Sequence, residues 1–212
     1  MANDRANLHD REHRRRTWKR DTLFGEGLAM ATIVGISGSL RRASFNAALL
    51  RAAVAEAPAG LTVEVASIRD IPLYDGDVEE RDGVPPPVAA LKERIAAADG
   101  LLLVTPEYNN SVPGVLKNAI DWLTRPPQDM PRVFGNRPVG LIGATPGPGG
   151  TRLSQTAWLP IFRTLNLRPF FARPLYIAGA GQVFDREGRL VDEKIRDLLR
   201  RYMASLAEFV SG

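Results

Sequence analysis

The sequence predicts an α/β protein built on one open, parallel, doubly wound sheet with helices on both faces. Segments of strand character alternate with segments of helical spacing five times along the chain, without an internal repeat. The run Leu101-Leu102-Leu103-Val104 is apolar throughout, as expected of a central parallel strand that is covered on both faces. At 212 residues the chain is long enough for one well-buried domain, which we place at residues 30–212.

The individual elements follow from apolar periodicity and from glycine and proline punctuation. Strands are predicted at 33–36, 61–66, 101–104, 138–142 and 170–177, and Pro174 marks a point where the last can break. Helices are predicted at 44–57, 88–98, 115–124, from 151 to about 165, and at 190–209. The intervening segments 71–87, 125–136 and 179–188 are predicted to be loops.

The first strand feeds the first helix through a turn that is rich in serine and glycine. Such a turn directs backbone N–H groups and the positive end of a helix at one point, which suits a phosphate. The side chains that can also donate there are Ser37, Ser39, Arg41, Arg42, Ser44 and Asn46. The alternative is an ordinary turn whose serine caps a helix. The turn lacks both G-x-x-x-x-G-K-[ST] and G-x-G-x-x-G, so it favours a terminal monophosphate over a triphosphate or a dinucleotide.

Three unusual loops, at 37–46, 105–114 and 144–151, each follow a predicted strand. In open parallel sheets, ligands bind outside the carboxyl ends of the strands, at the point where the strand order reverses. We therefore expect the three loops to meet at one site, although they lie far apart in sequence. For the glycine- and proline-rich third loop, simple turn punctuation is the alternative.

Composition excludes several classes of chemistry. The chain has no cysteine, and both histidines, His9 and His13, lie in the first thirty residues. The predicted domain therefore has no Cys- or His-based triad and no metal site that uses those ligands, which indicates that any catalysis depends on a bound organic cofactor. No apolar run approaches the roughly 20 residues of a membrane span, and a net charge of +4 does not indicate a nucleic-acid binder.

Residues 1–29 are predicted to be a basic, flexible N-terminal extension. The run from Arg14 to Arg20 could meet an anionic surface, but a solvated tail is the simpler interpretation. The segment lacks the apolar core of a secretory signal. Together with the lack of cysteine, this favours a cytoplasmic protein.

Three stretches carry a resemblance to a known family: GSLRRASFN, DIPLYDGD and TPEYNNSVPGVLKNAIDW. They resemble the NAD(P)H-dependent FMN reductases, and within that family the bacterial quinone and chromate reductases. The resemblance runs in order from Ala31 to the C-terminus. It implies a flavodoxin-like sheet of five strands in the order 2-1-3-4-5. It also implies a homodimer or a homotetramer.

The resemblance also implies the residues that hold FMN. The phosphate would be held by Ser39, Arg41, Ser44 and Asn46, in a loop that also contains Ser37 and Phe45. The wall and the hydrogen-bonding edge of the isoalloxazine would be formed by Pro106, Glu107, Tyr108 and Asn109, with Ser111 behind them. The third flavin-side loop would contain Gly149 and Gly150, whereas Asn110 receives no role.

Two of these residues have other interpretations. Tyr108 could simply cover the core at a strand end, and Glu107 could be a solvated loop acid or a subunit contact. Trp122 is predicted to be a packing residue.

Two classes of function fit the sequence. The first is an NAD(P)H oxidoreductase that works by a ping-pong mechanism, with NADPH or NADH as co-substrate and quinones, flavins, azo compounds or oxidised metal ions such as chromate as acceptors. A flavin supplies the reactive centre for such chemistry, so no catalytic side chain is needed. The second is an FMN-binding electron carrier or regulatory module without turnover. Carrier flavodoxins tend to be acidic and this domain is slightly basic, which favours the enzyme.

Overall fold

The computed structural model describes residues 30–212, and the predicted N-terminal extension lies outside them. Its strands are β1 (Ala31–Ser37), β2 (Leu61–Ala66), β3 (Gly100–Val104), β4 (Pro138–Ala144), β5 (Arg168–Pro169) and β6 (Leu175–Ile177). All pairings are parallel and the order is β2-β1-β3-β4-β5, with β6 also paired to β4. The predicted class and flavodoxin-like strand order are therefore confirmed.

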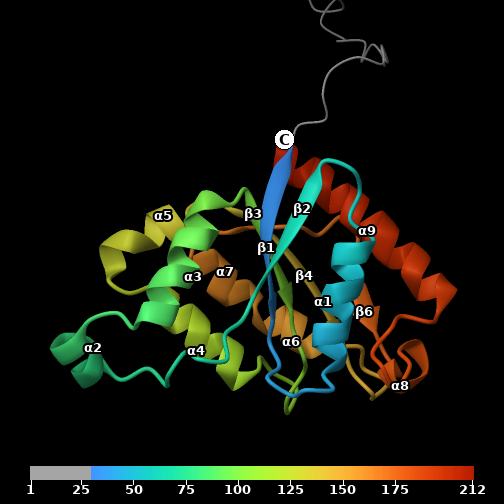
Figure 1. The fold of residues 1–212 in the computed structure, drawn as a ribbon, viewed down its shortest axis with the longest axis horizontal. Helices are drawn as coiled ribbons and strands as arrows, with labels where there is room; N and C mark the ends of the chain where they lie inside the picture. Colours follow the sequence, from blue (N-terminus) through green and yellow to red (C-terminus); the bar gives the residue numbers. More distant parts are fainter. Residues whose placement is uncertain (1–29) are drawn as a thin grey trace, which may run out of the picture.

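Helices cover both faces of the sheet. They are α1 (Phe45–Ala55), α2 (Gly76–Asp82), α3 (Pro86–Ala97), α4 (Gly114–Leu123), α5 (Met130–Phe134), α6 (Arg152–Ala157), α7 (Leu159–Thr164), α8 (Ala180–Val183) and α9 (Glu193–Ser211), with a 3-10 turn at Pro127–Asp129. In Figure 1, α3, α4 and α5 lie to one side of the sheet and α1 and α9 to the other. Each layer encloses its own buried apolar cluster against the sheet.

Local sequence explains where several helices begin. Ser44 caps α1 by accepting a hydrogen bond from the N–H of Ala47 at 3.2 Å, and Asp192 caps α9 by accepting one from Ile195 at 3.0 Å. Proline occupies the first turn of α3, where a backbone N–H would have no acceptor within the helix, so its absence costs no hydrogen bond. The capped helix α1 begins directly after the loop that follows β1.

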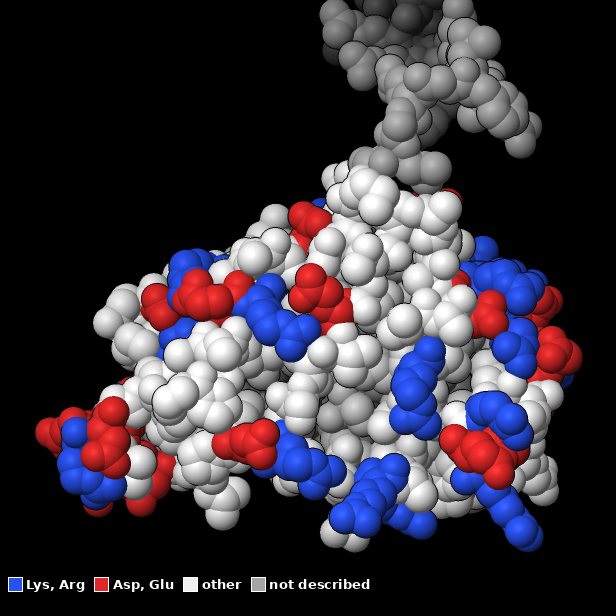
Figure 2. Space-filling view, in the orientation of Figure 1, with Lys and Arg blue, Asp and Glu red and all other residues white. Residues whose placement is uncertain are grey.

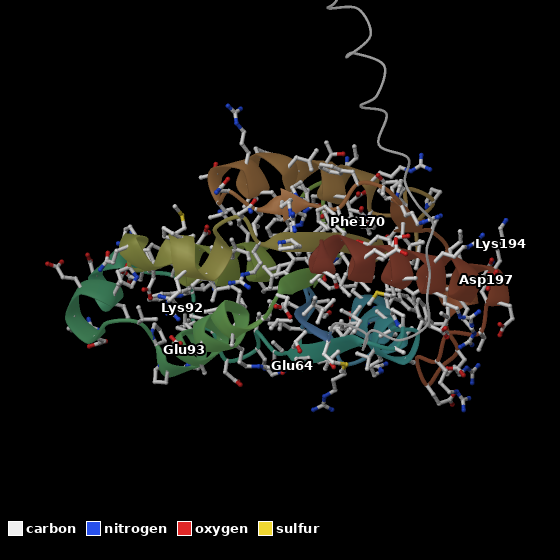
Figure 3. All side chains as sticks on the ribbon, turned by 90° about the horizontal axis from the view of Figure 1, so that it is seen from above. Glu64, Lys92, Glu93, Phe170, Lys194 and Asp197 are labelled. Atoms are coloured by element: carbon white, nitrogen blue, oxygen red, sulfur yellow. The ribbon has the colours of Figure 1, made fainter. Side chains whose placement is uncertain are left out.

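The prediction of five strands is wrong in one respect, because the fifth position in the sheet is filled by two short strands. β5 pairs with the beginning of β4 and β6 with its end. Between them the hydroxyl of Tyr202, from α9, accepts a hydrogen bond from the N–H of Leu141 at 2.9 Å. A side chain thus replaces the missing strand. Figure 3 places Phe170, which immediately follows β5, beside α9, and its ring meets that of Tyr202 edge-on at 5.3 Å.

The bounds of several helices and loops also differ from the predicted ones. The loop 71–87 contains α2, and 125–136 contains the 3-10 turn and α5. The helix predicted to run to about 165 is two helices, α6 and α7, which meet at Trp158 just before Pro160, and the last helix begins at 193 rather than 190. Short helices of this kind have too few turns to show apolar periodicity, so their formation depends on tertiary contacts.

Candidate functional site

The three unusual loops lie at the carboxyl edge of three adjacent strands, β1, β3 and β4. This edge is the lower edge of the sheet in Figure 1. The strand order reverses between β1 and β3, because the chain passes from β1 to β2 on one side of it and then to β3 on the other side. A crevice at such a reversal is the usual ligand site of this topology. The expected convergence of the loops is confirmed.

Gly38 allows the first and second loops to approach closely. A Cβ atom at this position would lie 2.9 Å from Pro106 Cδ and 2.9 Å from Leu116 Cδ2, closer than carbon atoms tolerate. The N–H of Gly38 donates to the carbonyl of Val104 at 2.8 Å, which continues the pairing of the strands into the loops. Pro106 itself is buried beneath this contact.

Serine hydroxyls order the first loop. Ser37 Oγ accepts from the N–H of Ser39, and Ser39 Oγ from that of Arg41, both at a long 3.4 Å. Each hydroxyl keeps its own proton to donate to a ligand. The guanidinium groups of Arg41 and Arg42 are exposed and form no ion pair within residues 30–212. The donors therefore suit an anion such as the FMN phosphate.

Asn46 occupies a supporting position behind this loop. Its side chain is buried, with its amide donating to the carbonyl of Ala144 and accepting from the N–H of the same residue, both at 2.9 Å. Ser44 is also buried and caps α1. The capping interpretation of Ser44 is therefore confirmed, while phosphate contact by these two residues stays a prediction.

The second loop contains a tight turn at Asn109-Asn110. Tyr108 and Ser111 exchange backbone hydrogen bonds of 3.3 and 3.1 Å, and the two asparagines have φ of 50° and 60°. Left-handed values at both central residues define a type I′ turn, which asparagine tolerates better than most residues. Asn110, which received no role from the sequence, is thus needed for the shape of this loop.

Tyr108 stands at the junction of the first two loops. Its side chain is 48% exposed, so it does not cover the core. Its hydroxyl donates to Ser39 Oγ at 3.4 Å, which places the phenol ring beside the serine-rich turn. Phe45, at the other end of that turn, is half-buried and stacks on Phe184 at 6.1 Å. An exposed aromatic ring next to phosphate donors is suited to a flat, phosphorylated ligand.

Glu107 connects the second loop to the third. Its Oε2 accepts from the N–H groups of Leu153 at 2.9 Å and Ser154 at 3.0 Å, in the first turn of α6. A carboxylate there satisfies free donors and offsets the positive end of the helix. Glu107 is therefore not a free solvated acid, while its contact with the flavin or with a neighbouring subunit stays a prediction.

Gly150 has φ of 65°, and a Cβ there would lie 3.0 Å from Tyr176 Cβ. Both the backbone conformation and the close approach to β6 require glycine. The neighbouring Gly149 is exposed, with Glu107 Oε1 3.6 Å from the position its Cβ would take. The third loop therefore lies against the second, as its proposed place beside the flavin requires.

A buried polar cluster behind the second loop was not predicted from the sequence. Thr105 Oγ1 lies 2.9 Å from Ser154 Oγ and accepts from Trp158 Nε1 at 3.1 Å. A threonine directly after an apolar strand was the available signal. Trp122 is fully buried and donates to the carbonyl of Pro72 at 2.9 Å, so its predicted packing role is confirmed.

The fold and the site together define a flavodoxin-like protein whose three unusual loops meet at the β1–β3 reversal. Residues 31–182 match the family model of the NADPH-dependent FMN reductases, so the chain belongs to that family. It is therefore an NAD(P)H-dependent oxidoreductase with FMN as its cofactor, as the resemblance predicted.

Individual relatives agree with this assignment. The chain is 42% identical over 178 residues to an NAD(P)H-dependent FMN reductase of Pseudomonas aeruginosa, covering 84% of this chain and 94% of that protein. It is 40% identical over 181 residues to a quinone reductase of Escherichia coli K12, with 84% and 94% covered. The flavoenzyme NAD(P)H:(acceptor) oxidoreductase of Paracoccus denitrificans has a similar structure, with a TM-score of 0.76, 30% identity, and coverage of 85% of this chain and 97% of that one.

Proposed function

We propose that this protein transfers electrons from NAD(P)H to quinones and related small acceptors by a ping-pong mechanism. The observation that carries the proposal is the contact between the exposed Tyr108 and Ser39, because it joins an open aromatic face to a phosphate-binding turn. The names of the P. aeruginosa and E. coli relatives, an FMN reductase and a quinone reductase, support the same chemistry.

The proposed cradle comprises Ser37, Ser39, Arg41, Ser44 and the beginning of α1. FMN, when bound, supplies the centre that accepts and donates the hydride. The cradle holds the phosphate by charge-assisted hydrogen bonds, while the positive end of α1 adds to the attraction. Pro106, Asn109, Ser111 and the turn at Gly149-Gly150 form the walls on either side. Since these walls are tied together through Glu107, they hold the ring in a fixed orientation.

Tyr108 faces the space that both substrates would use. A nicotinamide and then a quinone can each stack in this space only after the other has left, which gives alternating binding. The net reaction converts NAD(P)H, a proton and a quinone into NAD(P)⁺ and a hydroquinone. We extend the proposal to flavins, azo compounds and chromate as acceptors, because an open face selects weakly for shape.

Steady-state kinetics of the full chain reconstituted with FMN test the proposal. Initial rates are measured with NADPH or NADH against a benzoquinone, without oxygen. Parallel double-reciprocal lines are expected. Intersecting lines would contradict the ping-pong mechanism. A yellow protein that oxidises neither nucleotide would instead favour the electron-carrier alternative.

We also propose that the active form is a cytoplasmic dimer or a tetramer built of dimers. Within residues 30–212 no helix is both long and apolar enough to cross a membrane. Several large apolar side chains are exposed, among them Phe171 at 64% and Leu153 at 51%, as an interface between subunits would require. Analytical ultracentrifugation is expected to give a dimer or larger. A monomer with full activity at working concentration would contradict this.

A further inference from the structure

A basic pocket adjoins the proposed phosphate cradle and partly overlaps it. It has a volume of about 480 Å³ and lies between the first loop, α1 and the turn that follows α8. Arginines from all three segments line it: Arg41, Arg42, Arg51 and Arg186. Figure 2 shows blue side chains along the lower edge of the molecule, below α1 and around α8. The pocket shares Arg41 and Ser44 with the proposed cradle, whereas Arg51 and Arg186 do not belong to the cradle.

The four arginines have no carboxylate partner within residues 30–212, because the nearby acids are already engaged. Arg189 pairs with Asp185 at 2.6 Å and with Glu187 at 3.1 Å. Asp185 also accepts from the backbone N–H groups of Glu187 at 3.0 Å and Arg189 at 2.8 Å, and these bonds hold the pKa of its carboxyl below the ordinary value. The acids of the pocket are therefore occupied and its guanidinium groups remain available.

Gly188 permits the position of Arg51. A Cβ at Gly188, whose φ is 75°, would lie 2.7 Å from Arg51 Nη2. The guanidinium of Arg51 thus rests directly against the 185–189 turn. The turn is itself anchored by the bridge between Phe184 and Leu190. The pocket is consequently built from two ordered elements that approach one another closely.

We propose that this pocket binds the 2′-phosphate of NADPH and so gives the enzyme its preference for NADPH over NADH. Enzymes distinguish these nucleotides by an acid that binds the free 2′-hydroxyl or by an arginine that binds the 2′-phosphate. Here the acids are engaged and the arginines are available. Phe184 is buried, so the pocket offers a phosphate site more than a stacking face for a base. This inference rests on the proposed NAD(P)H-dependent function.

The position of the pocket is compatible with an extended nucleotide. Arg41 and Arg42 belong both to the pocket and to the loop that contacts Tyr108. A nicotinamide beside Tyr108 therefore lies across this loop from Arg51 and Arg186. The pyrophosphate of the nucleotide would pass over the loop beside the guanidinium group of Arg42, because Arg41 is assigned to the FMN phosphate.

Arg51→Gln and Arg186→Gln test the assignment without altering the cradle. Arg163→Gln is the matched control, since Arg163 is exposed on α7 and forms no ion pair within the described residues. For each variant, kcat/KM is measured with NADPH and with NADH. Binding of 2′,5′-ADP and of 5′-AMP to the FMN-loaded protein is measured by calorimetry.

The ratio of kcat/KM for NADPH to that for NADH is expected to fall about tenfold in either pocket variant and to stay unchanged in the control. Affinity for 2′,5′-ADP should fall similarly, with that for 5′-AMP unaffected. An unchanged ratio, including an equal loss of kcat/KM with both nucleotides, would overturn the assignment. A pocket variant that binds FMN more weakly but 2′,5′-ADP as tightly as the wild type would also overturn it. A wild-type protein that binds 2′,5′-ADP but oxidises neither nucleotide would refute the proposed function and not the pocket.

Discussion

The side-chain amide of Asn46 forms two hydrogen bonds of 2.9 Å with the backbone of Ala144, which lies 98 residues further along the chain. Asn46 is in the first turn of α1 and Ala144 is the last residue of β4. One side chain therefore joins the phosphate-binding turn to the third loop. Because both groups of Ala144 are buried, the pairing supplies hydrogen bonds that water cannot replace.

Replacement of Asn46 by alanine is expected to loosen the site and the fold together. Each buried group of Ala144 that loses its partner costs about 1–3 kcal/mol. Chemical unfolding should show the loss of stability, and titration with FMN should show weaker binding, because the two loops lose their connection. Unchanged stability would show that water or a neighbouring group substitutes for the amide. Unchanged FMN affinity would show that the third loop acts independently of the cradle.

Arg41→Ala should weaken FMN binding and leave much of the chemistry intact. Loss of a charge-assisted phosphate contact costs about 1.5–3 kcal/mol, or roughly 10- to 150-fold in affinity, and less where solvent screens the group. Excess FMN should then restore turnover, since the ring still occupies its place. Fluorescence titration measures the affinity. If it does not change, Arg42 or the serines hold the phosphate.

Tyr108→Ala should change the reaction kinetics more than the affinity for FMN, the opposite of Arg41→Ala. The phenol ring faces the space where nicotinamide and acceptor stack, so its removal should alter the rate of flavin reduction and the preference among acceptors, with a smaller effect on FMN affinity. Stopped-flow absorbance with NADPH and a panel of quinones measures both properties. If every kinetic constant is retained, the 105–111 loop is not the flavin wall.

Tyr202→Phe should destabilise the sheet without affecting the site. The N–H of Leu141 loses its acceptor, at a cost of about 1–3 kcal/mol, because no strand pairs with β4 at this point. FMN affinity should stay the same, since Tyr202 belongs to α9 on the covered face of the sheet. Urea denaturation compares the two proteins, and equal stability would show that the interrupted strand needs no substitute.

The same residue predicts a dependence on pH. Burial raises the pKa of Tyr202 above its ordinary value of 10.0, so the folded state favours the neutral phenol. The contribution of Tyr202 to the free energy of unfolding is complete below pH 10. It is lost as the pH rises above that value, because only the unfolded chain then releases the phenol proton. The difference in stability between wild type and Tyr202→Phe should therefore shrink at alkaline pH. A constant difference would contradict this explanation.

Removal of residues 1–29 should leave the melting temperature and flavin reduction nearly unchanged. The segment shows no core-forming periodicity and lies outside the matched family region, which begins at residue 31. Differential scanning calorimetry and NADPH oxidation by the truncated chain measure the outcome. A large loss of either would show that the segment contributes to the folded protein and would return His9 and His13 to consideration.

Local sequence by itself determined the parallel sheet, the three loops at its edge and the exclusion of Cys- and His-based chemistry from residues 30–212. Apolar runs such as 101–104 and capping residues such as Ser44 act over a few residues, so their effect can be read without the fold. The motifs at 37–46 and 105–114 carried the family resemblance for the same reason.

Tertiary structure alone decided which groups became partners across the chain. The sequence does not indicate that the side chain of Asn46 pairs with the backbone of Ala144, or that the carboxylate of Glu107 caps α6. The hydroxyl of Tyr202 takes the place of part of the fifth strand. A side chain that hydrogen-bonds to distant backbone leaves no periodic signal, because its partner is set by how the layers pack and not by its neighbours in sequence.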